Sequence, residues 1–144
     1  MSDENTANPE LEQLKRVMAD FQNYKRRTEE ERAELQIYAN KRLLEAIFPA
    51  LDNFSRAFAH IPKELEGNEW VKGVEAIEST LVKALESLGL ESIDQSGVPV
   101  NPHEHEVVME AEGPAGEVLQ VLEKGYRFNG KTIRPAKVQV GKDT

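Results

Sequence analysis

Two histidines in the C-terminal third of the chain alternate with glutamates, since His103 and His105 precede Glu104 and Glu106. If this stretch is a β-strand, both imidazoles point to the same face, where they could bind one metal ion. Two ligands do not complete a metal site, and His60 is the only other histidine in the sequence. We therefore expect a structural role for these residues, with no metal and no cofactor, and a metal-binding module is the alternative.

A second candidate is the basic stretch at residues 124–142, which holds six lysines and arginines and no acidic residue, in a chain whose formal net charge is -8. Its charged and apolar side chains share an expected hairpin: Lys124, Arg127, Lys131, Arg134 and Lys137 accompany Tyr126, Phe128 and Ile133. Such a surface would attract an acidic partner. RNA is one alternative, although aromatic residues for base stacking are few. Charges placed only for solubility and for protection of a sheet edge are another.

The composition argues against several other kinds of chemistry. The 144 residues include no cysteine, so they hold no disulfide, thiolate metal site or cysteine nucleophile. No metalloprotease, nucleophile-elbow, P-loop or dinucleotide-binding motif occurs, so we do not expect an enzyme. The 18 basic against 26 acidic residues argue against general nucleic-acid binding. No apolar run approaches the roughly 20 residues of a membrane span, and no signal peptide is recognisable, so we expect a cytoplasmic protein without a membrane partner.

The spacing of apolar residues predicts one long helix over residues 10–60. The first of them follow the alternating three- and four-residue steps of a coiled-coil seam: Leu11, Leu14, Met18 and Phe21. From Leu35 onward the pattern changes to a repeat of eleven residues, which is typical of a nearly straight or slightly right-handed supercoil. At about 1.5 Å per residue this helix would be roughly 70 Å long, so we expect a second copy of the chain to bury its stripe. Pro49 predicts a kink, or a break into two helices.

The remaining sequence predicts a shorter helix and a set of strands. The helix covers residues 69–88 and ends before Gly89, and in a dimer it would complete a four-helix bundle. Strands are predicted at residues 90–93, 106–110, 117–122, 126–128, 132–134 and 137–140. Asn129 followed by Gly130 is the strongest hairpin signal, because a type I′ turn needs positive φ at both residues. The predicted fold class is α+β: a disordered start at residues 1–9, a helical stalk and bundle, and a small all-β domain at residues 89–142.

A charge block lies within the predicted long helix. Arg26 and Arg27 stand four residues before Glu30 and Glu31, a spacing that allows ion pairs along one helix face. Such exposed pairs contribute only a few tenths of a kcal/mol each. Composition alone therefore favours a solvated helix face here.

Four blocks of the sequence resemble one protein family. They are DFQNYKRR at residues 20–27, LLEAIFPALDNF at 43–54, GVEAI at 73–77 and VLEKGYRFNGKTIRPAKV at 121–138. Their order, and the proline inside the second block, are similar to GrpE, the nucleotide exchange factor of DnaK-type heat-shock chaperones. The resemblance implies a parallel homodimer with a paired-helix coiled-coil stalk, a dimeric four-helix bundle and two β wings. One wing would enter the ATPase domain of the chaperone, open its nucleotide cleft and release ADP.

The resemblance also implies which residues make contacts. Carried over by motif, the chaperone contacts are Arg26, Arg27, Lys124, Gly125, Tyr126, Asn129, Gly130, Lys131, Ile133, Arg134, Pro135 and Val138. The dimer interface expected from the seam and from the resemblance contains Leu11, Leu14, Met18, Phe21, Leu35, Leu43, Ile47, Leu51, Phe54, Val74, Ile77 and Leu81. A rival hypothesis is a structural coiled-coil adaptor whose basic hairpin binds another acidic protein, and it predicts no effect on nucleotide release.

Overall fold

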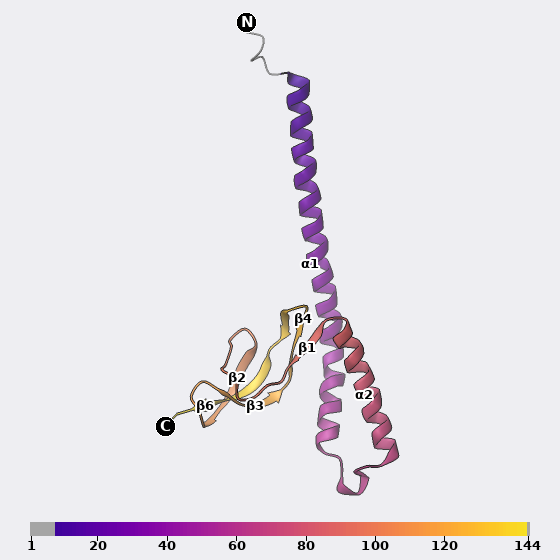
Figure 1. Cartoon of the computed structure of the whole chain (residues 1–144), viewed down its shortest axis with the longest axis vertical. Coiled ribbons are helices and arrows are strands. Elements are labelled where there is room, and N and C mark those ends of the chain that lie inside the picture. The colour runs from indigo at the N-terminus through magenta and orange to yellow at the C-terminus, as the bar shows by residue number, and fades with distance from the viewer. Residues whose placement is uncertain (1–7, 144) are drawn as a thin grey trace. The chain divides into compact units, whose positions relative to one another are not determined.

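The computed structural model describes residues 8–143, so most of the predicted disordered start lies outside the described residues. The helices are α1 (Pro9–Ala59), a short 3-10 helix (Lys63–Leu65) and α2 (Glu69–Ser87) (Figure 1). The strands are β1 (Leu90–Ile93), β2 (His105–Glu112), β3 (Val118–Glu123), β4 (Gly125–Phe128), β5 (Lys131–Arg134) and β6 (Ala136–Lys142). The α+β class is confirmed, and each strand lies where the sequence predicts one.

Helix α1 is continuous from its capped start to Ala59. The backbone N–H groups of Glu10 and Leu11 donate to Asn8 Oδ1 at 3.0 and 3.4 Å, which satisfies two of the free donors at the helix start. Pro49 lies inside the helix, so a break into two helices does not occur there. The residues beside it explain this, because Phe48 and Leu51 are both buried in a core that holds the helix on each side of the proline.

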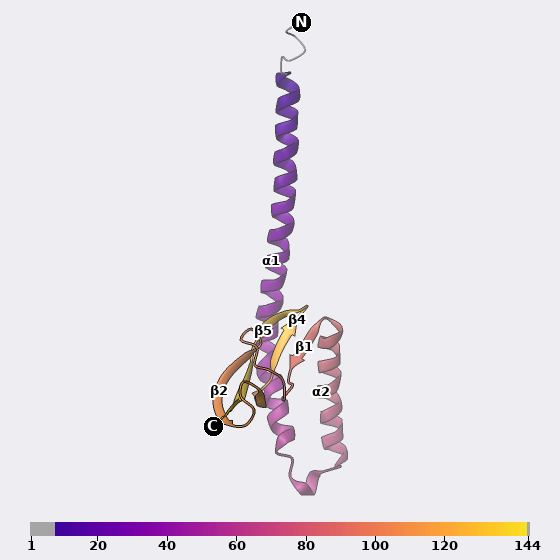
Figure 2. The ribbon, with the colours of Figure 1, turned by 60° about the vertical axis from the view of Figure 1, so that its left-hand side comes forward.

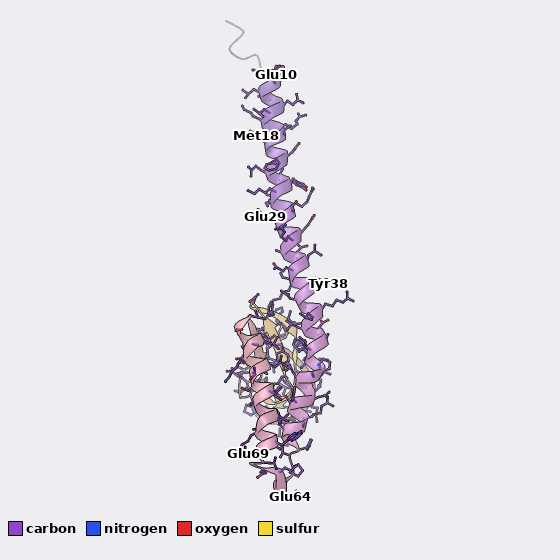
Figure 3. All side chains as sticks on the ribbon, turned by 90° about the vertical axis from the view of Figure 1, so that its right-hand side faces the viewer. Glu10, Met18, Glu29, Tyr38, Glu64 and Glu69 are labelled. Carbon is purple, nitrogen blue, oxygen red and sulfur yellow. The ribbon has the colours of Figure 1, made fainter. Side chains whose placement is uncertain are left out.

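The chain divides into two units between Leu43 and Leu44. The described part of the first unit is helix alone, and Figure 3 shows side chains such as Met18 and Glu29 projecting from it. The second unit contains the last part of α1, α2 and all six strands. The β region predicted as a separate domain at residues 89–142 therefore shares its compact unit with both helices.

The strands form two small sheets. In the first sheet the order is β1-β4-β5, and all pairs are antiparallel. In the second sheet the order is β2-β6-β3, with β2 parallel and β3 antiparallel to β6. Figure 2 shows β1, β4 and β5 beside the C-terminal part of α1.

The first of two buried clusters explains why the β region is not independent of the helices. The cluster under the first sheet combines helix and strand residues: Leu44, Phe48, Leu51, Leu90, Tyr126 and Ile133. The cluster of the second sheet is made by strands and loops around Ile93, Val118, Ala136 and Val138. Three short strands bury too little apolar surface alone, so the first sheet uses α1 as its second layer.

This packing changes the assignment of Leu51, which the sequence predicts at the dimer interface, and of several apolar residues on α2. Leu51 is 3% exposed within one chain, so it serves the intrachain core and not a surface between chains. On α2, Leu85 packs against the same core, whereas Trp70 and Ile77 stay exposed at 75% and 64%. The apolar residues of α2 that the sequence groups on one face therefore divide between the core and the surface.

Candidate functional site

The β4–β5 hairpin has the turn that its sequence predicts. Asn129 has a φ of 49° and Gly130 a φ of 82°, and Phe128 pairs with Lys131 across the turn. Positive φ at both central residues is the signature of a type I′ turn. The predicted hairpin is confirmed.

The hairpin tip, defined here as Asn129, Gly130 and Lys131, is exposed but held at its base. The N–H of Asn129 donates to the carbonyl of Gly89 at 3.0 Å. Gly89 has a φ of 115°, and a Cβ added there would lie 2.1 Å from Asn129 Oδ1. Glycine thus permits the close approach that fixes the tip against the segment between α2 and β1.

Most of the basic side chains around the hairpin are neutralised within the chain. Lys124 Nζ lies 3.6 Å from Asp94, Lys137 Nζ lies 3.5 Å from Glu123, and Arg127 pairs with Glu104 and, at 3.5 Å, with Glu91. The acidic partners all lie outside residues 124–142. The stretch that is basic in the sequence therefore forms a surface of mixed charge in the folded chain. Within residues 8–143, no ion pair involves Lys131, so the uncompensated charge of the hairpin is at its tip.

Arg134 is the most extensively bonded of these cations. Its Nη1 and Nη2 donate to the two carboxylate oxygens of Asp52, each at 2.8 Å. This hydrogen bonding is the main cause that raises the pKa of Arg134, against the opposing effect of burial. The guanidinium also lies 5.0 Å from the ring centroid of Phe48 and 5.2 Å from that of Tyr126. We call these four residues the arginine cluster.

Burial within the arginine cluster raises the pKa of Tyr126, against the lowering effect of the Arg134 charge. A tyrosine with a raised pKa binds its proton more tightly in the folded state. Its contribution to stability is therefore complete below about pH 10, the ordinary tyrosine pKa, and is lost as the pH rises through the folded-state value. As the pH rises above about 10, we expect the Tyr126→Phe variant to lose less unfolding free energy than the unchanged chain, measured by urea unfolding. Equal alkaline losses in both proteins would contradict this.

The structure divides the residues predicted to contact the chaperone into surface and interior. Asn129, Gly130 and Lys131 are exposed, while Lys124, Arg134 and Pro135 are partly exposed. Gly125, Tyr126, Ile133 and Val138 are buried, and Val138 has no exposed surface at all. A Cβ at Gly125 would lie 2.3 Å from the backbone nitrogen of Ala136. These four residues support the hairpin from within and offer no surface to a partner in this conformation.

Arg26 and Arg27 are exposed on the first unit and make the predicted pairs. Each arginine Nε lies 3.9 Å from a carboxylate oxygen, that of Glu30 or of Glu31. With both partners about two-thirds exposed, these pairs hold the side chains only weakly. Both guanidinium groups are therefore accessible to a partner.

The two histidines of the candidate metal motif have different surroundings. His105 is buried, and its Nδ1 accepts the backbone N–H of Asn101 at 2.9 Å. His103 is exposed, and its backbone N–H donates to the side chain of Asn101 at 2.9 Å. Among the described residues no cluster of three or more His, Cys, Asp or Glu side chains is arranged to hold a metal ion. The contacts support a role for His105 in shaping the loop before β2.

The residues predicted at a dimer interface are mostly uncovered in the single chain. Leu14, Met18 and Phe21 on the first unit are each more than half exposed. Exposed large side chains also include Leu11, Leu35, Leu43 and Ile77, while Ile47, Phe54, Val74 and Leu81 are half-buried. Contiguous apolar stripes of this kind mark interaction surfaces. No helix in residues 8–143 is long and apolar enough to cross a membrane.

A long helix with an open apolar stripe, together with a β region that exposes a charged tip held at its base, is typical of a protein that acts by binding other proteins. The family model described as GrpE matches residues 3–142. Protein GrpE of Brevibacillus choshinensis is 37% identical over 128 residues, which cover 87% of this chain and 72% of that protein. Protein GrpE of Halalkalibacterium halodurans is 37% identical over 132 residues, covering 90% and 68% of the two chains.

The match extends over nearly the whole chain, and so this chain belongs to the GrpE family. Its function is that of a nucleotide exchange factor, a co-chaperone of a DnaK-type chaperone, as the resemblance of the four sequence blocks implied. The adaptor hypothesis has no support from these comparisons. Sequence analysis did not single out Asp52 or Phe48 as site residues, although both lie in the second of those blocks.

Proposed function

We propose that this chain accelerates ADP release by docking its hairpin tip on the ATPase domain of a DnaK-type chaperone in the cytoplasm. The observation that carries the proposal is the exposed tip of Asn129, Gly130 and Lys131, which is held at its base and has an unpaired positive charge. A tip fixed in this way can press on a partner without deforming. The exposed Arg26 and Arg27 are proposed as a second contact with the same chaperone.

The mechanism requires only a difference in binding energy. A protein that binds the open nucleotide cleft more tightly than the closed one shifts the chaperone toward the open state. Reversing a 1:99 population takes about 5.5 kcal/mol of differential binding. A few well-packed and charge-assisted contacts at the tip can provide a difference of this size.

Binding and nucleotide release are reciprocal, which provides the test of this function. If the chain weakens ADP binding, then ADP weakens binding of the chain by the same factor. Titration of the chain onto the ATPase domain should therefore give a much tighter Kd without nucleotide than with ADP. Equal affinities in the two states would contradict the exchange mechanism, whereas an adaptor would show them.

We propose further that the working form is a parallel homodimer. The seam residues Leu14, Met18 and Phe21 lie on one stripe of α1 and remain exposed in the single chain. A second copy has the same stripe at the same heights, so a parallel pair buries it along its length. The exposed Trp70 and Ile77 of α2 would be covered in the same dimer.

The double change Leu14→Lys with Met18→Lys should convert the dimer to a monomer, because two like charges would replace apolar contacts in the seam. Sedimentation velocity at micromolar concentration should report half the mass of the unchanged dimer. Ala19→Lys with Asn23→Lys adds the same charge away from the seam and should leave the dimer intact. Equal masses for both double variants would contradict the assigned seam.

A further inference from the structure

The arginine cluster joins elements that lie far apart in the sequence. Arg134 ends β5, and Asp52 lies on α1, 82 positions earlier. Both side chains are largely covered, with 22% and 17% of their surface exposed. Two parallel N–H···O bonds between a guanidinium and a carboxylate fix orientation as well as distance. The pair therefore sets the angle between the hairpin and the helix.

The other contacts of Arg134 restrain it further. Its Nε and Nη2 both donate to the carbonyl of Lys124, at 3.2 and 2.6 Å, which ties the connection between β3 and β4 to the same group. Glu123 Oε1 lies 4.0 Å from Arg134 Nη1 and places a second negative charge beside the guanidinium. The rings of Phe48 and Tyr126 stack with centroids 4.4 Å apart and form an aromatic wall beside the guanidinium.

Apolar packing alone would not hold the hairpin at one angle. The cluster under the first sheet contains Leu44, Leu90 and Ile133, whose attraction depends on buried area and not on direction. A sheet resting on such contacts can rock with little loss of buried surface. The directional bonds of Arg134 to Asp52 and to the carbonyl of Lys124 oppose that motion.

We propose that Arg134 and Asp52 are positioning residues for nucleotide exchange, which hold the hairpin rigid on α1 so that tip binding forces the chaperone's cleft open. The inference rests on the proposed function. The sequence resemblance implies that Arg134 touches the chaperone directly. We infer instead that Arg134 acts by bonding to Asp52 and so holding the hairpin in place.

Exchange requires a hairpin held at one angle, because a flexible hairpin can adapt to either state of the chaperone's cleft. If the hairpin can rock, the tip binds the closed and open clefts almost equally, and a ligand with equal affinity for two states shifts neither. Loss of the clamp should therefore lower the maximal rate of ADP release at saturating concentrations of the chain. The concentration for half-maximal effect should change little, because the tip itself is intact.

The test uses substitutions on both sides of the ion pair between Arg134 and Asp52, made in the chain of 144 residues. Asp52→Asn removes the negative charge and keeps the side-chain size, while Arg134→Lys keeps the charge and loses the paired bonds. Arg127→Lys is the matched control on the neighbouring strand, where the arginine pairs with Glu91 and Glu104. Release of a fluorescent ADP analogue is measured over a full concentration series, at a temperature where circular dichroism shows all variants folded.

We expect Asp52→Asn and Arg134→Lys each to lower the maximal rate about tenfold, with half-maximal concentrations within about threefold of the unchanged chain. Arg127→Lys should stay within about twofold, and exchange of the two residues in Asp52→Arg with Arg134→Asp should recover part of the rate. A normal maximal rate for Asp52→Asn would overturn the inference. So would a raised half-maximal concentration confined to Arg134→Lys, which is the behaviour of a direct contact. An unchanged chain without any exchange activity would overturn the proposed function and this inference with it.

Discussion

Replacement of Phe48 by alanine is expected to lower the free energy of unfolding of the second unit by about 3–5 kcal/mol. The ring is 1% exposed and lies between Leu44 and Leu51 on its own helix and the first sheet. It also stacks on Tyr126 with centroids 4.4 Å apart. Removing it leaves a cavity at the junction of helix and sheet, and such cavities collapse only in part. Urea unfolding at one fixed chain concentration measures the loss, since an oligomer's stability depends on concentration.

Leu122→Ala provides the control for this prediction. Leu122 is 43% exposed on β3, so its truncation removes little buried surface and should change the unfolding free energy by less than about 1 kcal/mol. If Phe48→Ala had an effect as small as that of Leu122→Ala, the first sheet would not be packed on α1. The arginine cluster, which joins the first sheet to α1, would then not form as described.

The second large effect is expected at the hairpin tip. Lys131→Glu should reduce the acceleration of ADP release at subsaturating concentration by at least about tenfold, equivalent to about 1.4 kcal/mol of binding free energy. Lys131 is exposed at the turn, and among the described residues it has no ion-pair partner. Its charge is therefore free to attract the acidic partner that the basic hairpin predicts. A negative charge there would meet like charge, which disfavours the complex. The affinity of the chain for the nucleotide-free ATPase domain should fall in parallel.

Lys142→Glu makes the same change of charge elsewhere in the β region. Lys142 is exposed at the end of β6, opposite Glu112 of β2 and away from the hairpin. Its substitution should alter exchange by less than about twofold, because long-range charge effects are screened by salt. Equal losses for Lys131→Glu and Lys142→Glu would mean that net charge, and not the tip, determines binding.

Local signals account for what the sequence predicted well. The Asn129–Gly130 turn follows from the positive φ that both residues accept, and the helix start follows from the capping side chain of Asn8. Neither depends on distant residues. The positions of strands and helices were predictable for the same reason, because spacing and turn residues act over a few positions.

The packing of α1 was less predictable because its last part has apolar residues on adjoining faces. The sequence places Leu43, Leu51 and Phe54 at a dimer interface, whereas the structure buries Leu51 in the core of the single chain. Leu44 and Phe48, which the sequence does not single out, are buried beside it. Periodicity shows that a face is apolar but not whether the chain itself or a second copy covers it. The face of α1 that belongs to the core is identified by the residues of the first sheet that pack on it.

Charge compensation was the other feature that the sequence concealed. The stretch around Arg134 reads as uniformly basic, yet Arg134 pairs with Asp52 from 82 positions earlier. The family motif did not separate roles either, because it contains the exposed Lys131 and the buried Val138 within a few residues of each other. A motif records which residues a family needs and not whether each is needed for the fold or for a partner.

The most direct test of the account is the release of a fluorescent ADP analogue from the ATPase domain of a cognate DnaK-type chaperone, with and without this chain. We predict acceleration of at least about a hundredfold at saturation, since about 2.7 kcal/mol of differential binding is enough for that factor. The experiment requires a chain shown to be folded and dimeric. An unchanged release rate with such a chain would contradict nucleotide exchange by the hairpin.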